Sequence, residues 1–309
     1  MTFHAKLATA GLILATVLSG CSPAGDGKAG ADPAAAPTVA AVSDIRAFHI
    51  GTLEAVALKD GTLDLPNDNT TFGLGRTPQE VSAVLTAAGL PGDPIHLFID
   101  PLLIHDDDRQ VLIDTGAGGA MGTDGKLVQS LASAGVEPGQ ITDVLISHGH
   151  GDHVGGLVDA AGALRFPNAT IRISAAEWSA LQGDTAMTAL VRAITPRVKT
   201  FAPGEVVAPN ITAVDIPGHT PGHSGFEIVS GEDRLLYIGD AMHHPVISVQ
   251  RPEWPMGFDD DSTTAIASRQ ALLQRAASQN LRLYAYHFPF PGLGRVRRQG
   301  DGFVWVPGT

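Results

Sequence analysis

Three histidines and one aspartate lie within six positions of the chain, in the order His148-x-His150-x-Asp152-His153. Neutral imidazoles and carboxylates are the ligands that zinc and similar divalent cations accept. Residues two apart on an extended segment project to the same side, so His148 and His150 are placed to bind one ion. Asp152 and His153 follow where the chain turns and are placed to face a second ion. This spacing favours a metal site over a His-rich surface loop.

Four polar residues further along the chain are candidates for the remaining ligands, because the motif alone has too few side chains for two ions. Three of them, His223, Asp240 and His287, stand at the ends of predicted strands. The fourth, His219, precedes His223 by four residues in a loop rich in proline and glycine, where that spacing implies no shared helix face. We expect one of these two histidines to bind a metal and the other to support it.

The elements that must position these residues follow from the hydrophobic pattern. Apolar runs predict strands at residues 46–50, 53–58, 96–105, 110–114, 141–147, 170–174, 211–216, 226–230, 234–238, 281–286, 294–298 and 303–306. Amphipathic runs and capping residues predict helices at residues 77–88, 125–134, 175–181, 185–194 and 262–278. Strands and helices that alternate in groups in this way indicate two sheets covered by helices.

The ordered set of these motifs resembles the metallo-β-lactamase superfamily. The resemblance rests on the histidine motif, residues 218–223, Gly239-Asp240 and His287, and it extends from residue 44 to the end of the chain. It implies an αββα sandwich, an α/β fold of two mixed sheets with helices on the outer faces. It also implies one metal bound by His148, His150 and His223, and another bound by Asp152, His153 and His287. Asp240 would bridge the two ions, with His219 as a supporting histidine and Asp114 as an aspartate that supports a metal-bound side chain.

Asp114 also stands out from the sequence itself, because it ends a predicted buried strand. A carboxylate in that place either supports a metal-bound histidine or caps the turn, and the sequence leaves both readings open.

A closer resemblance is to methyl parathion hydrolase and its relatives. It rests on longer matches than the metal motif, at residues 53–62, 112–117, 166–169 and 290–294. It implies hydrolysis of aryl phosphotriesters, arylesters or lactones.

Two divalent ions, which we expect to be zinc, lower the pKa of a bridging water to near neutrality and polarise the substrate oxygen. The bridging hydroxide would attack a carbonyl carbon or a phosphorus, so we predict a binuclear hydrolase of an ester, lactone or phosphotriester. Asp152 is a candidate to steer the hydroxide or take a proton. His243 stands where quorum-quenching lactonases of the superfamily carry tyrosine, three residues after the bridging aspartate. It is a candidate hydrogen-bond donor to the reacting oxygen, or simply a loop histidine.

Other members of the superfamily fit the sequence less well. Common zinc β-lactamases place cysteine where Asp240 stands, and no cysteine follows Cys21. Glyoxalase-type thioesterases add a helical C-terminal domain, whereas the tail after His287 is short and strand-like. An iron-dependent oxidoreductase with the same ligands and a non-catalytic metal-binding lipoprotein remain alternatives. Candidate walls of a substrate pocket are four apolar residues beside the motif loops, Met121, Trp178, Met242 and Phe288.

The N-terminal segment has the pattern of an export signal. Leu7 to Leu18 is apolar but short for a membrane span, and residues 18–21 resemble the bacterial lipobox, in which Cys21 would carry lipid. A plain secretory signal and a buried core helix are the alternatives. We predict a signal peptide with lipobox at residues 1–21, a disordered linker at 22–43 and a catalytic domain at 44–309. The protein would then be exported and anchored on the periplasmic side of a bacterial membrane.

The net charge of −12 argues against a nucleic-acid partner, which requires a basic face. The expected partner is a small-molecule substrate, and the only expected membrane contact is the lipid on Cys21. The sequence carries no signal for an oligomeric state.

Overall fold

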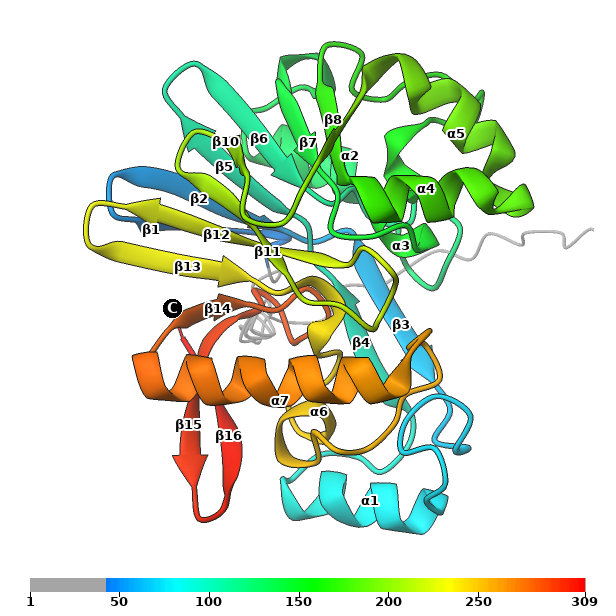
Figure 1. Ribbon diagram of the computed structural model, residues 1–309, viewed down its shortest axis with the longest axis vertical. Coiled ribbons are helices and arrows are strands. Elements are labelled where there is room, and N and C mark those ends of the chain that lie inside the picture. The colour runs from blue at the N-terminus through cyan, green and yellow to red at the C-terminus, as the bar shows by residue number, and fades with distance from the viewer. Residues whose placement is uncertain (1–42, 309) are drawn as a thin grey trace, which may run out of the picture. The chain divides into compact units, whose positions relative to one another are not determined.

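The computed structural model describes residues 43–308, in which two seven-stranded sheets pack face to face (Figure 1). The predicted signal peptide and all but the last residue of the predicted linker lie outside the described residues. None of the helices within residues 43–308 is long and apolar enough to cross a membrane.

Both sheets are mixed. The first sheet has the order β1 (Ile45–Ile50), β2 (Leu53–Leu58), β5 (Leu102–Asp106), β6 (Arg109–Ile113), β7 (Asp143–Leu145), β8 (Thr170–Ser174) and β9 (Val198–Phe201). The second has the order β10 (Val206–Ala208), β11 (Ile211–Asp215), β12 (Ser224–Ser230), β13 (Asp233–Tyr237), β14 (Arg282–Tyr284), β15 (Leu293–Gln299) and β16 (Gly302–Pro307). Strands β6 to β9 are parallel, as is the β13–β14 pair, and all other pairs are antiparallel.

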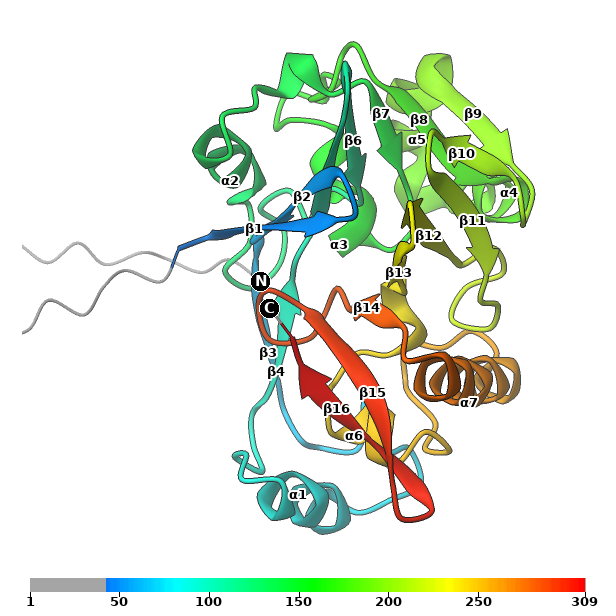
Figure 2. The same ribbon diagram turned by 90° about the vertical axis from the view of Figure 1, so that its left-hand side faces the viewer.

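Helices cover the outer face of each sheet (Figures 1 and 2). The first sheet is covered by α2 (Leu127–Ser133), α3 (Gly151–Val154), α4 (Ala175–Gly183) and α5 (Thr188–Ile194), and the second by α7 (Ser262–Gln279). Successive side chains of β6 point to opposite faces of the sheet, so both faces are apolar and both are covered. Val111 and Ile113 face the core between the sheets, while Leu112 faces the helices. The αββα sandwich predicted from the sequence is confirmed.

A small sheet extends the sandwich and corrects one prediction. Residues 96–105 do not form one strand, because the chain breaks at Asp100-Pro101, where proline has no N–H to donate. Strand β4 (Ile95–Ile99) instead pairs with β3 (Gly61–Leu65), and β5 pairs with β2. Helices α1 (Pro78–Ala87) and α6 (Ile247–Gln250) pack against β3 and β4 in a separate apolar cluster. Five single turns of 3-10 helix complete the domain, at Pro138–Gln140, Gly155–Leu157, Thr185–Met187, Thr195–Arg197 and Gly239–Ala241.

Side-chain caps set the ends of the predicted helices. Thr77 and Glu80 form the expected capping box at the start of α1, with Pro78 in the first turn. Asp261 caps the start of α7, and Asn280, the residue after its last turn, adopts a left-handed conformation.

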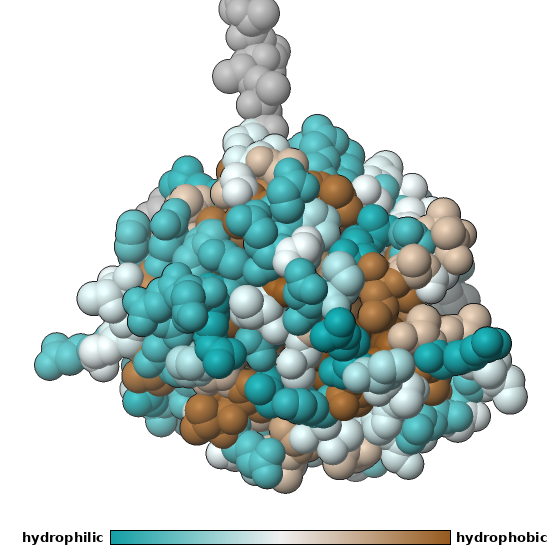
Figure 3. All heavy atoms as spheres, turned by 90° about the horizontal axis from the view of Figure 1, so that it is seen from above, coloured by the Kyte–Doolittle hydropathy of each residue, from teal (hydrophilic) through white to brown (hydrophobic). Residues whose placement is uncertain are grey.

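The face seen from above mixes hydrophilic residues with small separate hydrophobic patches (Figure 3). Isolated apolar residues of this kind are normal for a protein surface.

Asp60 holds the loop of residues 115–127 in place through hydrogen bonds to its backbone. Its buried carboxylate accepts hydrogen bonds from the backbone N–H groups of Ala117, Gly125 and Leu127, at 3.0, 3.1 and 2.8 Å. Three donors from one loop converge on one residue, so the position of the loop depends on this carboxylate.

Substitution Asp60→Ala is expected to lower the free energy of unfolding by about 3–5 kcal/mol, because several backbone donors lose their acceptor at about 1–3 kcal/mol each. Urea denaturation measures the effect. Asp215→Ala, at an exposed strand end, is the matched control and should change stability by less than about 0.5 kcal/mol. Equal stability of the two variants would contradict the role of Asp60.

Candidate metal centre

Side chains of the types that bind metals, from five segments, meet at one edge of the two sheets. Because β6 and β7 are parallel, as are β13 and β14, the carboxyl ends of each pair lie at one edge. The converging residues are His148 and His150 after β7, Asp152 and His153 in α3, His219 between β11 and β12, Asp240 after β13, and His287 after β14. All are buried except His150 and Asp152, which are partly exposed.

The first group consists of His148, His150, His219 and Asp240, whose ligand-type atoms all lie within 4.8 Å of one another. Nε2 of His219 lies 3.2 Å from Nε2 of His148 and 3.0 Å from Nδ1 of His150. Three imidazole nitrogens pointing at one another form the arrangement that a divalent cation joins.

The second group consists of Asp152, His153 and His287, beside the same aspartate. Nε2 of His153 lies 3.2 Å from Oδ1 of Asp240, yet neither atom makes a hydrogen bond within the described residues. Nε2 of His287 lies 3.2 Å from Oδ2 of Asp240. Buried polar atoms without partners indicate an additional group. With a donor set of imidazole nitrogens and carboxylate oxygens, the residues fit two divalent ions, with Asp240 between them.

Buried carboxylates give this centre a negative potential. Burial alone would lower the pKa of His153, yet the nearby carboxylates raise it well above its usual value. Burial would raise the pKa of Asp240, yet the surrounding imidazoles hold it well below its usual value. His148 is different, because burial lowers its pKa well below the usual value. The potential that favours a proton on His153 also favours a bound cation.

The structure exchanges the roles predicted for His219 and His223. Nδ1 of His223 donates to the carbonyl of Ile216 at 2.8 Å, and Nε2 accepts from the backbone N–H of Asp240 at 2.9 Å. Both ring nitrogens are therefore occupied, and burial lowers the pKa of His223 to about 3. We revise the ligand set so that His219 replaces His223, which instead supports the loop of Asp240. Nothing in the sequence of this loop distinguishes the two.

Asp114 lies where a supporting aspartate was expected. Its Oδ2 accepts from Nδ1 of His153 at 2.8 Å and from the hydroxyl of Tyr237 at 2.7 Å. The backbone N–H of Ser147 donates to Oδ1 at 2.8 Å, and its hydroxyl donates to Oδ2 at 2.6 Å. Asp114 therefore fixes the ring of His153 and the segment that carries His148.

His219 is oriented by a chain of contacts that the sequence did not reveal. Its Nδ1 lies 3.0 Å from Oδ1 of Asp259, whose other oxygen accepts from Arg269 of α7 at 3.0 Å. The buried Arg269 also donates to the carbonyls of Ala241, Pro252 and Trp254. A carboxylate behind a metal-binding histidine fixes its tautomer and its orientation.

Glu177 joins the two ligand-bearing loops and was also missed. The pattern Ser174-x-x-Glu177 suggests a capping box, in which the glutamate folds back onto the helix start. Instead, Oε1 accepts from the backbone N–H of Gly149 at 2.7 Å. Oε2 accepts from the hydroxyl of Thr220 at 2.7 Å and the N–H of Gly222 at 2.9 Å. The buried carboxylate therefore holds the loop of His148 and His150 against the loop of His219.

A cavity of about 250 Å³ opens beside the metal-binding groups. Its polar wall contains His150, Asp152, Asp240, His243 and His287. Its apolar wall contains Leu63, Leu97, Met121 and Phe258. A small cavity with convergent polar groups and an apolar wall is typical of a substrate site.

Of the four predicted pocket residues, only Met121 lines this cavity. Trp178 packs in the cluster beneath the helices of the first sheet. Met242 and Phe288 are fully buried in the cluster beneath α7, where Phe288 contacts Trp305 edge-on at 4.8 Å. These three predictions were wrong because proximity to a motif does not fix which way a side chain points.

His243 projects into the cavity, unlike the neighbouring Met242. Its Nε2 lies 3.1 Å from Oδ2 of Asp240, and its ring stacks on His287 at 5.2 Å. Burial lowers the pKa of His243 to about 4. The ring therefore lies beside both metal-binding groups and faces the space where a substrate would bind.

Residues 95–287 match the family model of the metallo-beta-lactamase superfamily. Among solved structures, AidC, a dizinc quorum-quenching lactonase in complex with the product N-hexanoyl-L-homoserine, superposes with a TM-score of 0.82. It is 31% identical, and the alignment covers 86% of this chain and 98% of AidC.

Two further proteins extend this similarity. The hydrolase AbOPH, of the beta-lactamase superfamily, has a TM-score of 0.80 and 26% identity, with 87% of this chain and 98% of AbOPH covered. The uncharacterized protein YobT of Bacillus subtilis (strain 168) is 29% identical over 193 residues, which are 57% of this chain and 78% of YobT.

Substitution Glu177→Gln is expected to lower the affinity for the ion held by the first group by about 10- to 100-fold. In the glutamine variant, the amide NH₂ would face a hydrogen-bond donor at a position where a carboxylate oxygen now accepts a hydrogen bond. Zinc release to a competing chelator measures this affinity directly. Glu232→Gln, in the exposed turn between β12 and β13, is the control and should release zinc like the wild type. Indistinguishable release from both variants would refute the role of Glu177.

Proposed function

The chain belongs to the metallo-β-lactamase superfamily, and we propose that it is a binuclear metal-dependent hydrolase that opens a lactone or ester with an apolar acyl group. The observation that carries the proposal is the cavity in which Asp152, Asp240 and His287 face an apolar wall. Polar groups at one side place the bond to be cleaved, and the apolar side binds the remainder of the substrate.

One ion would be held by His148, His150 and His219, the other by Asp152, His153 and His287, and Asp240 would contact both. Bound divalent ions acidify water and polarise the oxygen of the substrate. We propose zinc, because the donors are nitrogen and oxygen atoms that zinc accepts and the similar AidC is a dizinc lactonase.

The protein's own groups would then complete the reaction. Asp152 lines the cavity, and its carboxylate would accept the proton of the attacking water and return it to the leaving alcohol. His243 would donate a hydrogen bond to the substrate oxygen on which charge develops. Leu63, Leu97, Met121 and Phe258 would hold the acyl group and exclude bulk water.

The lactone is favoured by the likeness to AidC, which was solved with an acylated homoserine product. A phosphotriester is the second candidate, favoured by the sequence stretches that resemble methyl parathion hydrolase. A phosphorus centre and a carbonyl carbon both accept attack by water, so the cavity wall rather than the ligand set selects between them.

A substrate panel on zinc-loaded protein tests the proposal. We expect hydrolysis of N-acyl homoserine lactones and aryl esters, loss of activity with a chelator, and recovery with zinc. Iron in the purified protein together with dioxygen consumption would overturn the hydrolytic function. Absence of turnover on lactone, ester and phosphotriester with both metals bound would favour a non-catalytic role.

Substitution Asp240→Ala is expected to remove metal as well as activity, because one carboxylate lies between both groups. Bound zinc should fall below the wild-type stoichiometry, and kcat/KM should fall by more than about 100-fold. Loss of a residue that only supports a metal ligand costs up to about 100-fold, and loss of a ligand should cost more. Elemental analysis and kinetics check the two effects. Full metal content in this variant would show that Asp240 does not join the groups.

Substitution His243→Ala is expected to lower kcat by about 10- to 100-fold with unchanged zinc content, as for the loss of a hydrogen bond to a charged oxygen. His243→Tyr restores a donor and should recover part of the rate. Unchanged turnover in His243→Ala would remove this residue from the mechanism. Lost zinc would instead identify it as a ligand.

A further inference from the structure

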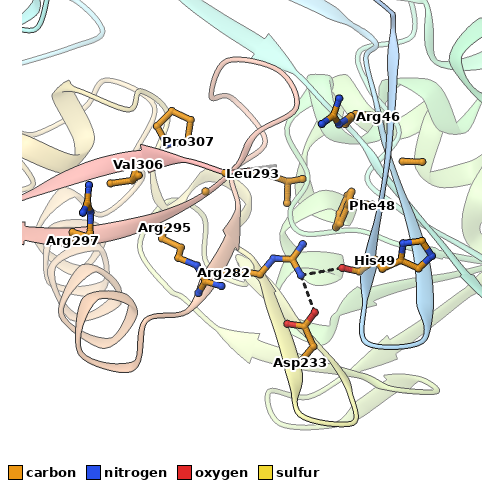
Figure 4. Close-up of a pocket in the computed structure, with 13 residues that line it drawn as sticks. Arg46, Phe48, His49, Asp233, Arg282, Leu293, Arg295, Arg297, Val306 and Pro307 are labelled. Carbon is orange, nitrogen blue, oxygen red and sulfur yellow. Dashed lines mark hydrogen bonds and ion pairs between the residues drawn. The ribbon is translucent and has the colours of Figure 1, made fainter.

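A second, larger cavity of about 850 Å³ lies between β1 and the C-terminal hairpin of β15 and β16 (Figure 4). It shares no lining residue with the substrate cavity. Its walls come from the outermost strand of the first sheet on one side and from strands β13 to β16 of the second sheet on the other. The proposed hydrolysis uses none of its residues.

Four arginines line this cavity, which is therefore named the arginine cleft: Arg46, Arg282, Arg295 and Arg297. Arg282 is paired with Asp233 at 2.9 Å, donates to the carbonyl of His49 and lies over the ring of Phe48 (Figure 4). The other three form no ion pair within the part of the chain that the structure describes. In a chain with a net charge of −12, such a cluster attracts an anion.

The cavity also has an apolar lining. Leu293, Arg295 and Arg297 alternate along β15 and therefore share one face, with Val306 paired to Arg295 across the hairpin. Phe48 of β1 and Leu293 are buried. Guanidinium groups beside apolar side chains suit an amphiphile with an anionic head, because arginine binds phosphate in a bidentate manner.

The cavity is lined by β1, the first strand of the described domain, and this position indicates which amphiphile would bind there. The predicted linker from Cys21 joins the described domain at β1, and Arg46 is the second residue of that strand. A lipid on Cys21 would thus tether the domain to a membrane by way of β1, a strand that lines this cavity. A membrane anchor is commonly a lipid combined with a basic surface.

Other occupants fit less well. A second copy that used the same surface would bring the arginines of both copies together, which is repulsive. A soluble phosphate ester shares the head-group chemistry but would leave the partly exposed Val306 and the exposed Pro307 uncovered. We propose that the cleft binds the phosphate head group of an anionic phospholipid at the membrane surface. This inference rests on the predicted lipid site at Cys21 and does not depend on the hydrolytic activity.

Vesicle flotation tests the proposal with the full chain carrying Cys21→Ala, which removes the lipid site. Vesicles contain phosphatidylcholine alone or mixed with phosphatidylglycerol. The apolar segment before Cys21 contacts both kinds, so the preference for phosphatidylglycerol is the readout. Arg46→Ser with Arg297→Ser should reduce that preference by at least about tenfold, since basic residues near an anionic surface each add to binding.

Arg192→Ser with Arg197→Ser is the control, because it removes the same charge from exposed positions at α5 and the turn that follows it. Equal losses in the two double variants would show a response to overall charge and overturn the proposal. No preference for phosphatidylglycerol in the parent chain would overturn it as well. Binding of glycerol phosphate without a vesicle preference would assign the cleft to a soluble anion instead.

Discussion

The buried carboxylate of Asp240 is the interaction on which the centre depends. Its oxygens lie between 3.1 and 3.6 Å from ring nitrogens of five histidines, His148, His153, His219, His243 and His287. A buried carboxylate among so many imidazoles is stable only if positive charge is shared around it, by protons or by cations. Asp240 follows β13 of the second sheet, whereas His148 and His153 follow β7 of the first. One carboxylate therefore couples the two sheets at their common edge.

In three of these histidines the supporting contact binds the same ring nitrogen, Nδ1, which leaves Nε2 available to the centre. Nδ1 of His153, His219 and His287 is bound by Asp114, Asp259 and the carbonyl of Phe98, respectively, so that Nε2 faces Asp240. In His223 both nitrogens are bound by the backbone. A histidine at this edge is available as a ligand only when the ring nitrogen that faces the centre remains free, Nδ1 in His150 and Nε2 in these three, and that depends on contacts from distant segments.

This dependence sets how much the sequence could predict. The motif of His148 to His153 is local, and the strand ends that carry Asp240 and His287 follow from hydrophobic runs, so these residues could be named in advance. The choice between His219 and His223 could not, because it depends on Ile216 and on the loop of Asp240. Glu177 was hidden for the same reason. Its spacing from Ser174 signals a helix cap, while its side chain acts across two loops.

The separation of the ligands from the cavity wall has a consequence for substrate choice. Leu63 and Leu97 come from the small β3–β4 sheet, and Met121 comes from the loop that Asp60 fixes. Strand β4 also orients His287 through the carbonyl of Phe98, but the side chains that form the wall take no part in that contact, so they are able to change while the candidate ligands stay in place. The arginine cleft adds a third independent surface. Because it shares no residue with the substrate cavity, binding there and binding of the substrate would use separate side chains.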